Sequence, residues 1–258
     1  MKVWITGASS GIGEACAYEY AAQGASLILT ASRADKLGAV AAECIRLGAK
    51  AACALPYDLQ NPDGIPELCR KAWDSYDGID ILFCNAGVSQ RTRVEDTSME
   101  MVRKIMEINY FAPVAICKGI LPFMPAQGGG HVAVTTSIAG RFGFPLRCGY
   151  SSSKFALYGF FETLAAEHGE IKVTIVCPGR VNTNISMNAL VEGGARYGKM
   201  DPGQAGGLDA AKAARKITSA IRKGKREVLV GRKELLMVYI KRFFPGLCAK
   251  LAKNLKPV

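Results

Sequence analysis

A tyrosine and a lysine lie four residues apart in the stretch GYSSSKFAL, residues 149–157, with only serines between them. If this stretch is helical, Tyr150 and Lys154 share one face, because residues i and i+4 are neighbours on a helix surface. A phenol titrates at about pH 10, so it needs a nearby positive charge to exchange protons near neutrality. The spacing therefore suggests acid–base chemistry, although Tyr-x-x-x-Lys also arises by chance in many helices.

A glycine-rich turn, TGASSGIG at residues 6–13, follows a strand-like run and opens a helix-like one. Glycines there let the backbone approach a phosphate, and the helix N-terminus offers free N–H groups and the positive end of its dipole. We therefore expect this turn to bind the phosphates of a nucleotide. The alternative is a tight turn without a ligand.

Strand-like apolar runs alternate with longer helix-like segments along the whole chain. This alternation predicts βα units on a mostly parallel sheet with helices on both faces, a doubly wound Rossmann-type α/β fold. The Val/Ile/Leu-rich runs suit a sheet that is buried on both sides. A chain of 258 residues fits a single domain, 1–258. The predicted strands are 3–6, 26–31, 50–59, 79–87, 131–137, 171–179 and 226–231, and the predicted helices include 35–47, 62–75 and a long one over 98–123, broken near Pro113.

The motifs on these elements, taken in order, resemble those of the short-chain dehydrogenase/reductase family over nearly the whole chain. Each motif alone is common, and the full set in this order is very specific. Cys84 stands where the family usually has a second asparagine, a departure that does not endanger catalysis. The matches are the turn at 6–13, Asp58-Leu59, Asn85-Ala86-Gly87, Asn109, Ser137, Tyr150, Lys154, Pro178-Gly179, Val181 and Thr183.

The resemblance implies an oxidoreductase that transfers a hydride between a nicotinamide and a carbonyl or secondary alcohol. It makes Tyr150 the acid/base that protonates the alkoxide. Lys154 would favour the phenolate by its positive charge and bond the nicotinamide ribose. Ser137 would hold the substrate oxygen, and Asn109 would anchor a water that links Lys154 to solvent.

The resemblance also implies which residues hold the cofactor. Related NAD enzymes place an Asp or Glu at the end of the second strand, where it binds the ribose 2′-OH. Here that strand ends LTASR, with Ala31 and Ser32 in place of the acid and Arg33 next to them. This favours NADP(H) over NAD(H), unless Arg33 is only a solvated surface charge. The implied cofactor residues are Thr6, Gly7, Ser9, Ser10, Gly11, Ile12, Gly13, Arg33, Asp58, Leu59, Asn85, Ala86, Gly87, Tyr150, Lys154, Pro178, Gly179, Val181 and Thr183.

A segment over about 184–207 is expected to cover the substrate, and its glycine-rich part, 193–207, is expected to be a mobile loop. Apolar side chains in and near this segment suggest a lipophilic ketone or aldehyde as substrate. They could equally well only pack the loop. These side chains are Phe142, Phe144, Ile185, Met187 and Leu190.

The net charge of +11 is concentrated at the C-terminus. Residues 212–258 hold 14 Lys/Arg and 2 Asp/Glu, whereas residues 1–211 hold 19 and 20. The segment 233–258 interleaves basic residues with Phe and Leu, which suits an interfacial amphipathic segment on anionic lipid. Packing on another subunit or over the substrate pocket is the alternative. A nucleic-acid binder is not favoured, because the net positive charge is confined to the C-terminal residues and because the sequence shows no aromatic stacking platform or recognition motif.

Nine cysteines without a Cys-x-x-Cys pair, and only two histidines, indicate reduced thiols and no metal site. Since the chain shows neither an apolar run of membrane-spanning length nor a secretory signal, we expect a cytoplasmic protein, peripheral to a membrane if the tail binds lipid. The resemblance implies a homodimer or homotetramer. A non-enzymatic sensor or scaffold is the competing class. The intact Asn109, Ser137, Tyr150 and Lys154 argue against it.

Overall fold

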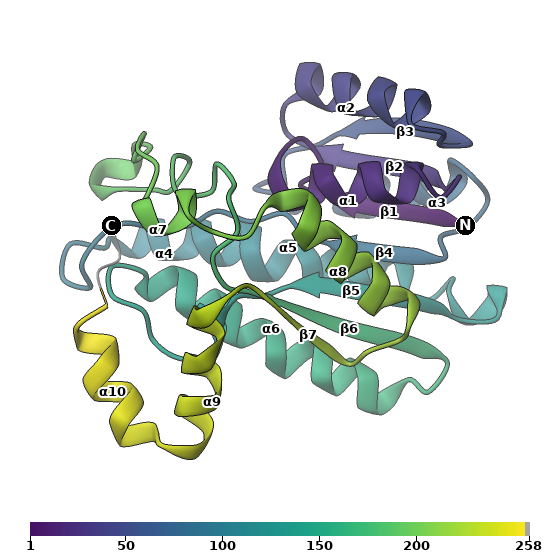
Figure 1. Ribbon diagram of the computed structural model, residues 1–258. Coiled ribbons are helices and arrows are strands. Elements are labelled where there is room, and N and C mark those ends of the chain that lie inside the picture. Colours follow the sequence, from purple (N-terminus) through teal and green to yellow (C-terminus); the bar gives the residue numbers. More distant parts are fainter. Residues whose placement is uncertain (256–258) are drawn as a thin grey trace.

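Seven parallel strands form one sheet in the computed structural model, which describes residues 1–255. The strand order is β3-β2-β1-β4-β5-β6-β7 (Figure 1). The first three strands are added toward one edge of the sheet and the last four toward the other, so the switch point lies between β1 and β4. In such sheets ligands bind outside the carboxyl ends of the strands at the switch point. The strands are β1 (Lys2–Thr6), β2 (Ser26–Ala31), β3 (Ala51–Pro56), β4 (Ile81–Cys84), β5 (Gly130–Thr135), β6 (Ile171–Pro178) and β7 (Glu227–Val230).

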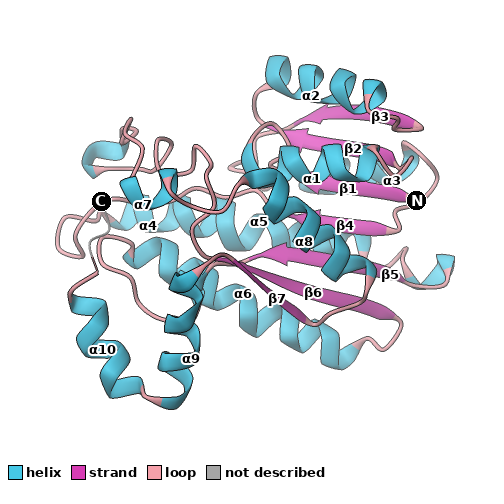
Figure 2. Cartoon of the chain, viewed as in Figure 1, coloured by secondary structure: helices cyan, strands magenta, loops and turns pink. Residues whose placement is uncertain are grey.

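Helices cover both faces of the sheet (Figure 2). Two separate apolar cores lie between these helices and the sheet. One core joins α1, α2 and α8 to side chains such as Val3 and Ile5, and the other joins α3, α5 and α6 to Trp4. The two sets alternate along β1 because successive side chains of a strand point to opposite faces. The helices are α1 (Gly11–Ala21), α2 (Ala34–Arg46), α3 (Ile65–Asp74), α4 (Met99–Met106), α5 (Ala112–Ile120), α6 (Cys148–Glu167), α7 (Pro202–Ala205), α8 (Ala210–Arg222), α9 (Leu236–Phe243) and α10 (Pro245–Lys253).

The long helix expected over 98–123 is divided into α4 and α5 by a π-helical segment, Glu107–Phe111. The break thus lies just before Pro113, where the sequence placed it. Proline has no N–H for the carbonyl four residues back, here that of Asn109, and its ring crowds that oxygen. The wider turn relieves this conflict, and the Asn109 side chain becomes completely buried.

The segment expected to be a loop over 193–207 contains the short helix α7, and backbone pairs just before and just after the segment tie it to the body. Leu190 pairs with Gln90, and Leu208 with Val181. The C-terminal segment forms two helices, with the chain turning at Phe244, because the residue before Pro245 is disfavoured in a helix. The last three residues of the segment 233–258 lie outside the described part of the chain. Within residues 1–255, no helix is long and apolar enough to cross a membrane.

Candidate active site

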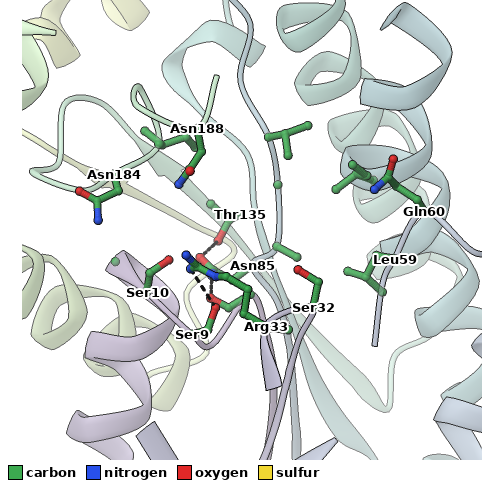
Figure 3. A pocket seen from close by; sticks show the side chains of 18 of the residues that line it. Ser9, Ser10, Ser32, Arg33, Leu59, Gln60, Asn85, Thr135, Asn184 and Asn188 are labelled. Carbon is green, nitrogen blue, oxygen red and sulfur yellow. Dashed lines mark hydrogen bonds between the residues drawn. The ribbon is translucent and has the colours of Figure 1, made fainter. Parts of the chain in front are cut away.

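A cavity of about 400 Å³ lies at the carboxyl ends of the strands, around the switch point between β1 and β4. Figure 3 shows its polar side chains converging from several elements. It is lined by Gly7, Ser9, Ser10, Gly11, Ile12, Ala31, Ser32, Arg33, Tyr57, Asp58, Leu59, Gln60, Asn85, Ala86, Gly87, Val88, Lys104, Ile108, Thr135, Tyr150, Lys154, Thr183, Asn184, Ile185, Asn188, Leu190, Gly194 and Arg196.

The glycine turn packs too closely on its neighbours for larger residues. Gly7 has a left-handed backbone, φ +67°, and a Cβ there would lie 2.7 Å from Ala86 Cα. A Cβ on Gly13 would lie 2.6 Å from Asn85 Nδ2. The turn leads into α1, whose N-cap Ser10 makes no capping hydrogen bond through its side chain. Backbone N–H groups and this hydroxyl are therefore the kind of donors that a pyrophosphate needs.

Hydrogen bonds fix the glycine turn to the ends of β4 and β5. Thr6 Oγ1 accepts from the N–H groups of Asn85 (3.1 Å) and Ala86 (3.2 Å), and Asn85 Nδ2 donates to Thr6 O at 3.2 Å. Thr135 Oγ1 in turn donates to Asn85 Oδ1 at 3.1 Å. One network thus holds three strand ends in register around the cavity.

The end of β2 presents a cation and no carboxylate to the cavity. Ala31, Ser32 and Arg33 all line it, and Arg33 Nη2 donates to Ser9 Oγ at 3.3 Å (Figure 3). Asp58 is the single acidic residue among those that line the cavity, and it follows β3. Its Oδ1 accepts from the N–H of Gln60 at 3.0 Å. A ligand with a negatively charged group at the end of β2 would therefore be attracted by Arg33.

Asn109 lies behind the cavity wall. Its Oδ1 accepts from the N–H of Val88 at 2.8 Å, while its Nδ2 donates to Val88 O at 2.9 Å and to Ser153 Oγ at 3.0 Å. It therefore joins the π-helical segment to the chain after β4 and to α6.

Tyr150 and Lys154 lie on one face of α6, as their spacing predicted. Lys154 Nζ donates to Thr135 O at 2.8 Å and lies 5.9 Å from the centre of the Tyr150 ring. Ser137 lies two residues after β5, and its Oγ accepts a hydrogen bond from the N–H of Ala139 at 3.1 Å. All three side chains are buried, with 8% of Tyr150 and Ser137 exposed and 2% of Lys154.

Burial dominates the electrostatics of this pair. Burial raises the pKa of Tyr150, while a hydrogen bond with Ser137 and the charges of Arg147 and Arg91 act to lower this pKa. Loss of hydration lowers the pKa of Lys154 to about 7. The sequence prediction assigned the support for the phenolate to Lys154 and, to a smaller extent, to the nearby helix start, and it missed the two arginines.

Arg91 and Arg147 meet at the buried carboxylate of Asp201. Arg91 forms an ion pair with Asp201, and Arg147 Nη2 lies 3.4 Å from Asp201 Oδ2. Asp201 directly precedes α7, so this cluster fastens the predicted covering segment to the start of α6. Nothing in the spacing of these three residues indicated that they would meet.

Fourteen of the predicted site residues line the cavity. Thr6, Gly13, Asn109 and Ser137 lie next to it and support or adjoin its walls. Pro178 ends β6, Gly179 and Val181 follow it, and all three stay outside the lining, with Val181 buried. Sequence reasoning missed several lining residues, although Thr135 could have been found from its place two residues before Ser137. The missed residues are Tyr57, Gln60, Val88, Lys104, Ile108, Thr135, Asn184, Asn188, Gly194 and Arg196.

The apolar side chains expected around the substrate divide into three groups. Ile185 and Leu190 line the cavity, whereas Met187 is 38% exposed. Phe142 and Phe144 are buried in a cluster with Tyr150. Side chains of the C-terminal segment pack in or against the same cluster, namely Met237, Val238 and Ile240 of α9, Cys248 of α10, and the flanking Leu235 and Leu255. The C-terminal helices therefore pack against the surroundings of Tyr150.

Solved structures share this architecture. An alcohol dehydrogenase from the archaeon Thermococcus sibiricus, complexed with 5-hydroxy-NADP, has a TM-score of 0.78 at 26% identity, covering 90% of this chain and 96% of the other. A short-chain dehydrogenase/reductase from Burkholderia phymatum, in complex with NAD, has a TM-score of 0.83 at 23% identity, covering 95% and 94%. The second likeness, at this low identity, shows the fold.

Sequence relatives cover almost the entire chain. The mouse dehydrogenase/reductase SDR family member 7B is 38% identical over 251 residues, which are 95% of this chain and 78% of the mouse protein. A Drosophila melanogaster SDR family protein 7-like chain is 36% identical over 245 residues, 93% of this chain and 75% of its own length. The family model for short chain dehydrogenases matches residues 1–192. The chain therefore belongs to the short-chain dehydrogenase/reductase family.

Proposed function

We propose that this protein is an NADP(H)-dependent oxidoreductase that interconverts a carbonyl and a secondary alcohol, with Asn109, Ser137, Tyr150 and Lys154 as its catalytic residues. The observation that carries the proposal is that Tyr150 and Lys154 line the same cavity as the glycine turn. The bound nicotinamide supplies or accepts the hydride. The protein must then move one proton at the substrate oxygen.

Tyr150 is the group that moves this proton. In reduction its hydroxyl protonates the developing alkoxide, and in oxidation its phenolate takes the proton from the alcohol. Ser137, at hydrogen-bond reach of the phenol, holds the substrate oxygen. Lys154 binds the nicotinamide ribose. Asn109, whose side chain is bonded to Val88, anchors a water that links Lys154 to solvent.

Tyr150→Phe removes the proton donor and keeps the ring. We predict that kcat falls at least about 100-fold, since general acid–base catalysis contributes 10²–10⁴-fold, while the NADPH Kd stays nearly constant. The control is Tyr158→Phe on the same helix, whose hydroxyl bonds Thr136 and Glu227 outside the cavity. Steady-state kinetics and NADPH fluorescence titration provide the two numbers. A Tyr150→Phe enzyme with near wild-type kcat would rule out this acid.

Lys154 makes the stability depend on pH. Its pKa is about 7 in the folded chain and about 10.4 when unfolded, so the unfolded state binds more protons between these values. We predict that the wild type gains stability relative to Lys154→Met as pH rises from 7 toward 10, by at most about 1.4 kcal/mol per pH unit. Urea unfolding at several pH values measures this difference. If the stability difference between wild type and Lys154→Met stayed constant or fell over this pH range, the lowered pKa of Lys154 would be wrong.

NADP(H) is the preferred cofactor in this proposal. Arg33 stands at the cavity beside Ser9, where it suits a 2′-phosphate, and the end of β2 lacks the carboxylate that would repel one. The Thermococcus sibiricus relative was solved with an NADP derivative. NAD(H) is the alternative, and the Burkholderia phymatum neighbour was solved with it.

Ala31→Asp should shift the cofactor preference toward NAD. The new carboxylate repels a 2′-phosphate and accepts a hydrogen bond from a 2′-OH. We predict that the ratio of kcat/KM for NADPH to that for NADH falls at least roughly tenfold, or about 1.4 kcal/mol. Ala31→Asn is the matched control, because it adds the same bulk without charge. Equal effects of Asp and Asn would show that bulk, and not charge, is responsible, and a wild type preferring NADH would refute the assignment.

The substrate is lipophilic in this proposal. Ile185 and Leu190 present apolar surface to the cavity, and Phe142 and Phe144 pack around Tyr150 together with the C-terminal helices. The apolar part of an aliphatic or aromatic ketone or aldehyde would contact Ile185 and Leu190, which lie among polar side chains of the same segment such as Asn188. Purified protein with NADPH and a panel of such compounds tests the substrate class.

The outer face of α9 and α10 is proposed as a contact for anionic lipid. While the inner side of these helices packs near Tyr150, their outer side exposes large apolar residues and cations (Figure 1 shows the helices in yellow). Apolar burial and attraction of roughly 1 kcal/mol per basic residue would add at such a surface. The outer face consists of Leu236, Tyr239, Lys241, Arg242, Phe243, Phe244, Leu247, Lys250, Leu251 and Lys253.

Replacing Phe243 and Phe244 together by Ser should weaken binding to phosphatidylserine vesicles without changing kcat, because both side chains point to solvent. Wild type should float with these vesicles, less at high salt, because salt screens the charges and not the apolar contacts. Phe111→Ser, at another exposed phenylalanine, is the control. If the wild type does not float at low salt, the membrane contact is refuted. A smaller oligomer of the double variant by sedimentation would assign the face to the proposed homodimer or homotetramer instead.

A further inference from the structure

The Gln90 side chain occupies a special position at the start of the helix that carries Tyr150. Gln90 follows β4 and is completely buried. Its Oε1 accepts from the backbone N–H groups of Gly149 at 2.9 Å and Tyr150 at 3.3 Å. These groups belong to the first turn of α6, where backbone N–H groups have no partner within the helix. The N-cap Arg147 makes no capping bond through its side chain, so a residue distant in sequence caps this helix.

The amide nitrogen of Gln90 fixes the orientation of this cap. Nε2 donates to Thr92 Oγ1 and Thr97 Oγ1, both at 2.7 Å, and lies 3.2 Å from Cys148 Sγ. A primary amide has two donor hydrogens and one acceptor oxygen with two lone pairs, so these contacts use its full capacity. A rotated amide would place N–H groups against the N–H groups of the helix.

The backbone around Gln90 is held as firmly as its side chain. The N–H of Arg91 donates to Leu190 O at 2.8 Å, and the N–H of Leu190 donates to Ser89 O at 2.9 Å. The short stretch Ser89–Arg91 is therefore fixed by the segment that closes the cavity. Gln90 itself does not line the cavity, so it can act on bound molecules only through other residues.

We propose that Gln90 is a positioning residue that holds the backbone of Tyr150 so that its hydroxyl stays beside Ser137. This proposal rests on the proposed role of Tyr150 as proton donor. The phenol hydroxyl lies at the end of a long rigid side chain, so a small tilt of the first helical turn displaces it. A displacement of about 1 Å at a reacting group can reduce a rate 10²-fold. Nicotinamide cofactor binding should change much less than kcat, because it also depends on the glycine turn and the end of β2, and because Lys154 lies one turn further along α6.

Three variants test the proposal. Gln90→Met keeps the length and removes every hydrogen bond, whereas Gln90→Glu keeps an oxygen that can accept from Gly149 and Tyr150. Gln127→Met is the matched control, since Gln127 Nε2 bonds Ile79 O and Gly129 O near the amino ends of β4 and β5, away from the cavity. We expect Gln90→Met to lower kcat roughly 10- to 100-fold with little change in the NADPH Kd. Gln90→Glu should recover most of kcat, and Gln127→Met should retain it.

Hydrogen exchange gives a readout that does not depend on turnover. The peptide over residues 148–152 should exchange faster in Gln90→Met than in wild type, and not in Gln127→Met. Wild-type kcat in Gln90→Met, or equal losses in Gln90→Met and Gln90→Glu, would overturn the proposal. If Gln90→Met does not fold, a Gln90→Glu enzyme that lost kcat as fully as Tyr150→Phe would overturn it as well. A fully active Tyr150→Phe enzyme would instead refute the proposed function, so the two failures are distinguishable.

Discussion

The hydrogen bond from Lys154 Nζ to Thr135 O, 2.8 Å long, joins α6, the helix that carries Tyr150, to the end of β5. It places an ionisable group where hydration is lost, and this lowers the pKa of Lys154 to about 7. The same Thr135 holds Asn85 through its hydroxyl, and Asn85 holds the glycine turn through Thr6. Helix, sheet and turn therefore share one polar network, and the relative position of Tyr150 and the cavity depends on it.

The π-helical segment and the start of α6 position the other groups of the site. The π-helical segment brings Asn109 to Val88 and Ser153, which fixes the wall between α4 and α6. Arg91 and Arg147 gather at Asp201, and their charges oppose the rise in the pKa of Tyr150 that burial causes. Burial without these charges would leave the phenol a weaker acid. The site thus combines a dry environment with a few fixed donors and charges.

Much of this arrangement follows from local sequence. The apolar runs predicted all seven strands, because a sheet covered on both faces requires almost continuously apolar strands. The order of the motifs indicated the family, and fourteen of the catalytic and cofactor residues predicted from the sequence line the cavity. Local sequence could not predict the meeting of Arg91, Arg147 and Asp201, since these residues are joined only by the folded chain. It likewise missed the cap that Gln90 gives to α6. It offered packing over the substrate pocket only as an alternative role of the C-terminal segment, and α9 and α10 do pack against the surroundings of Tyr150.

The central claim is that this site passes a hydride between a nicotinamide and a carbonyl carbon. Deuterium transfer tests it most directly: NADPH labelled at C4 is incubated with the protein and a panel of lipophilic ketones and aldehydes, and the alcohols are analysed by mass spectrometry. We predict a single deuterium on the carbinol carbon of the product, from only one of the two C4-labelled epimers of NADPH. Alcohol without deuterium from both labelled epimers, or no oxidation of NADPH by any member of the panel, would contradict the account.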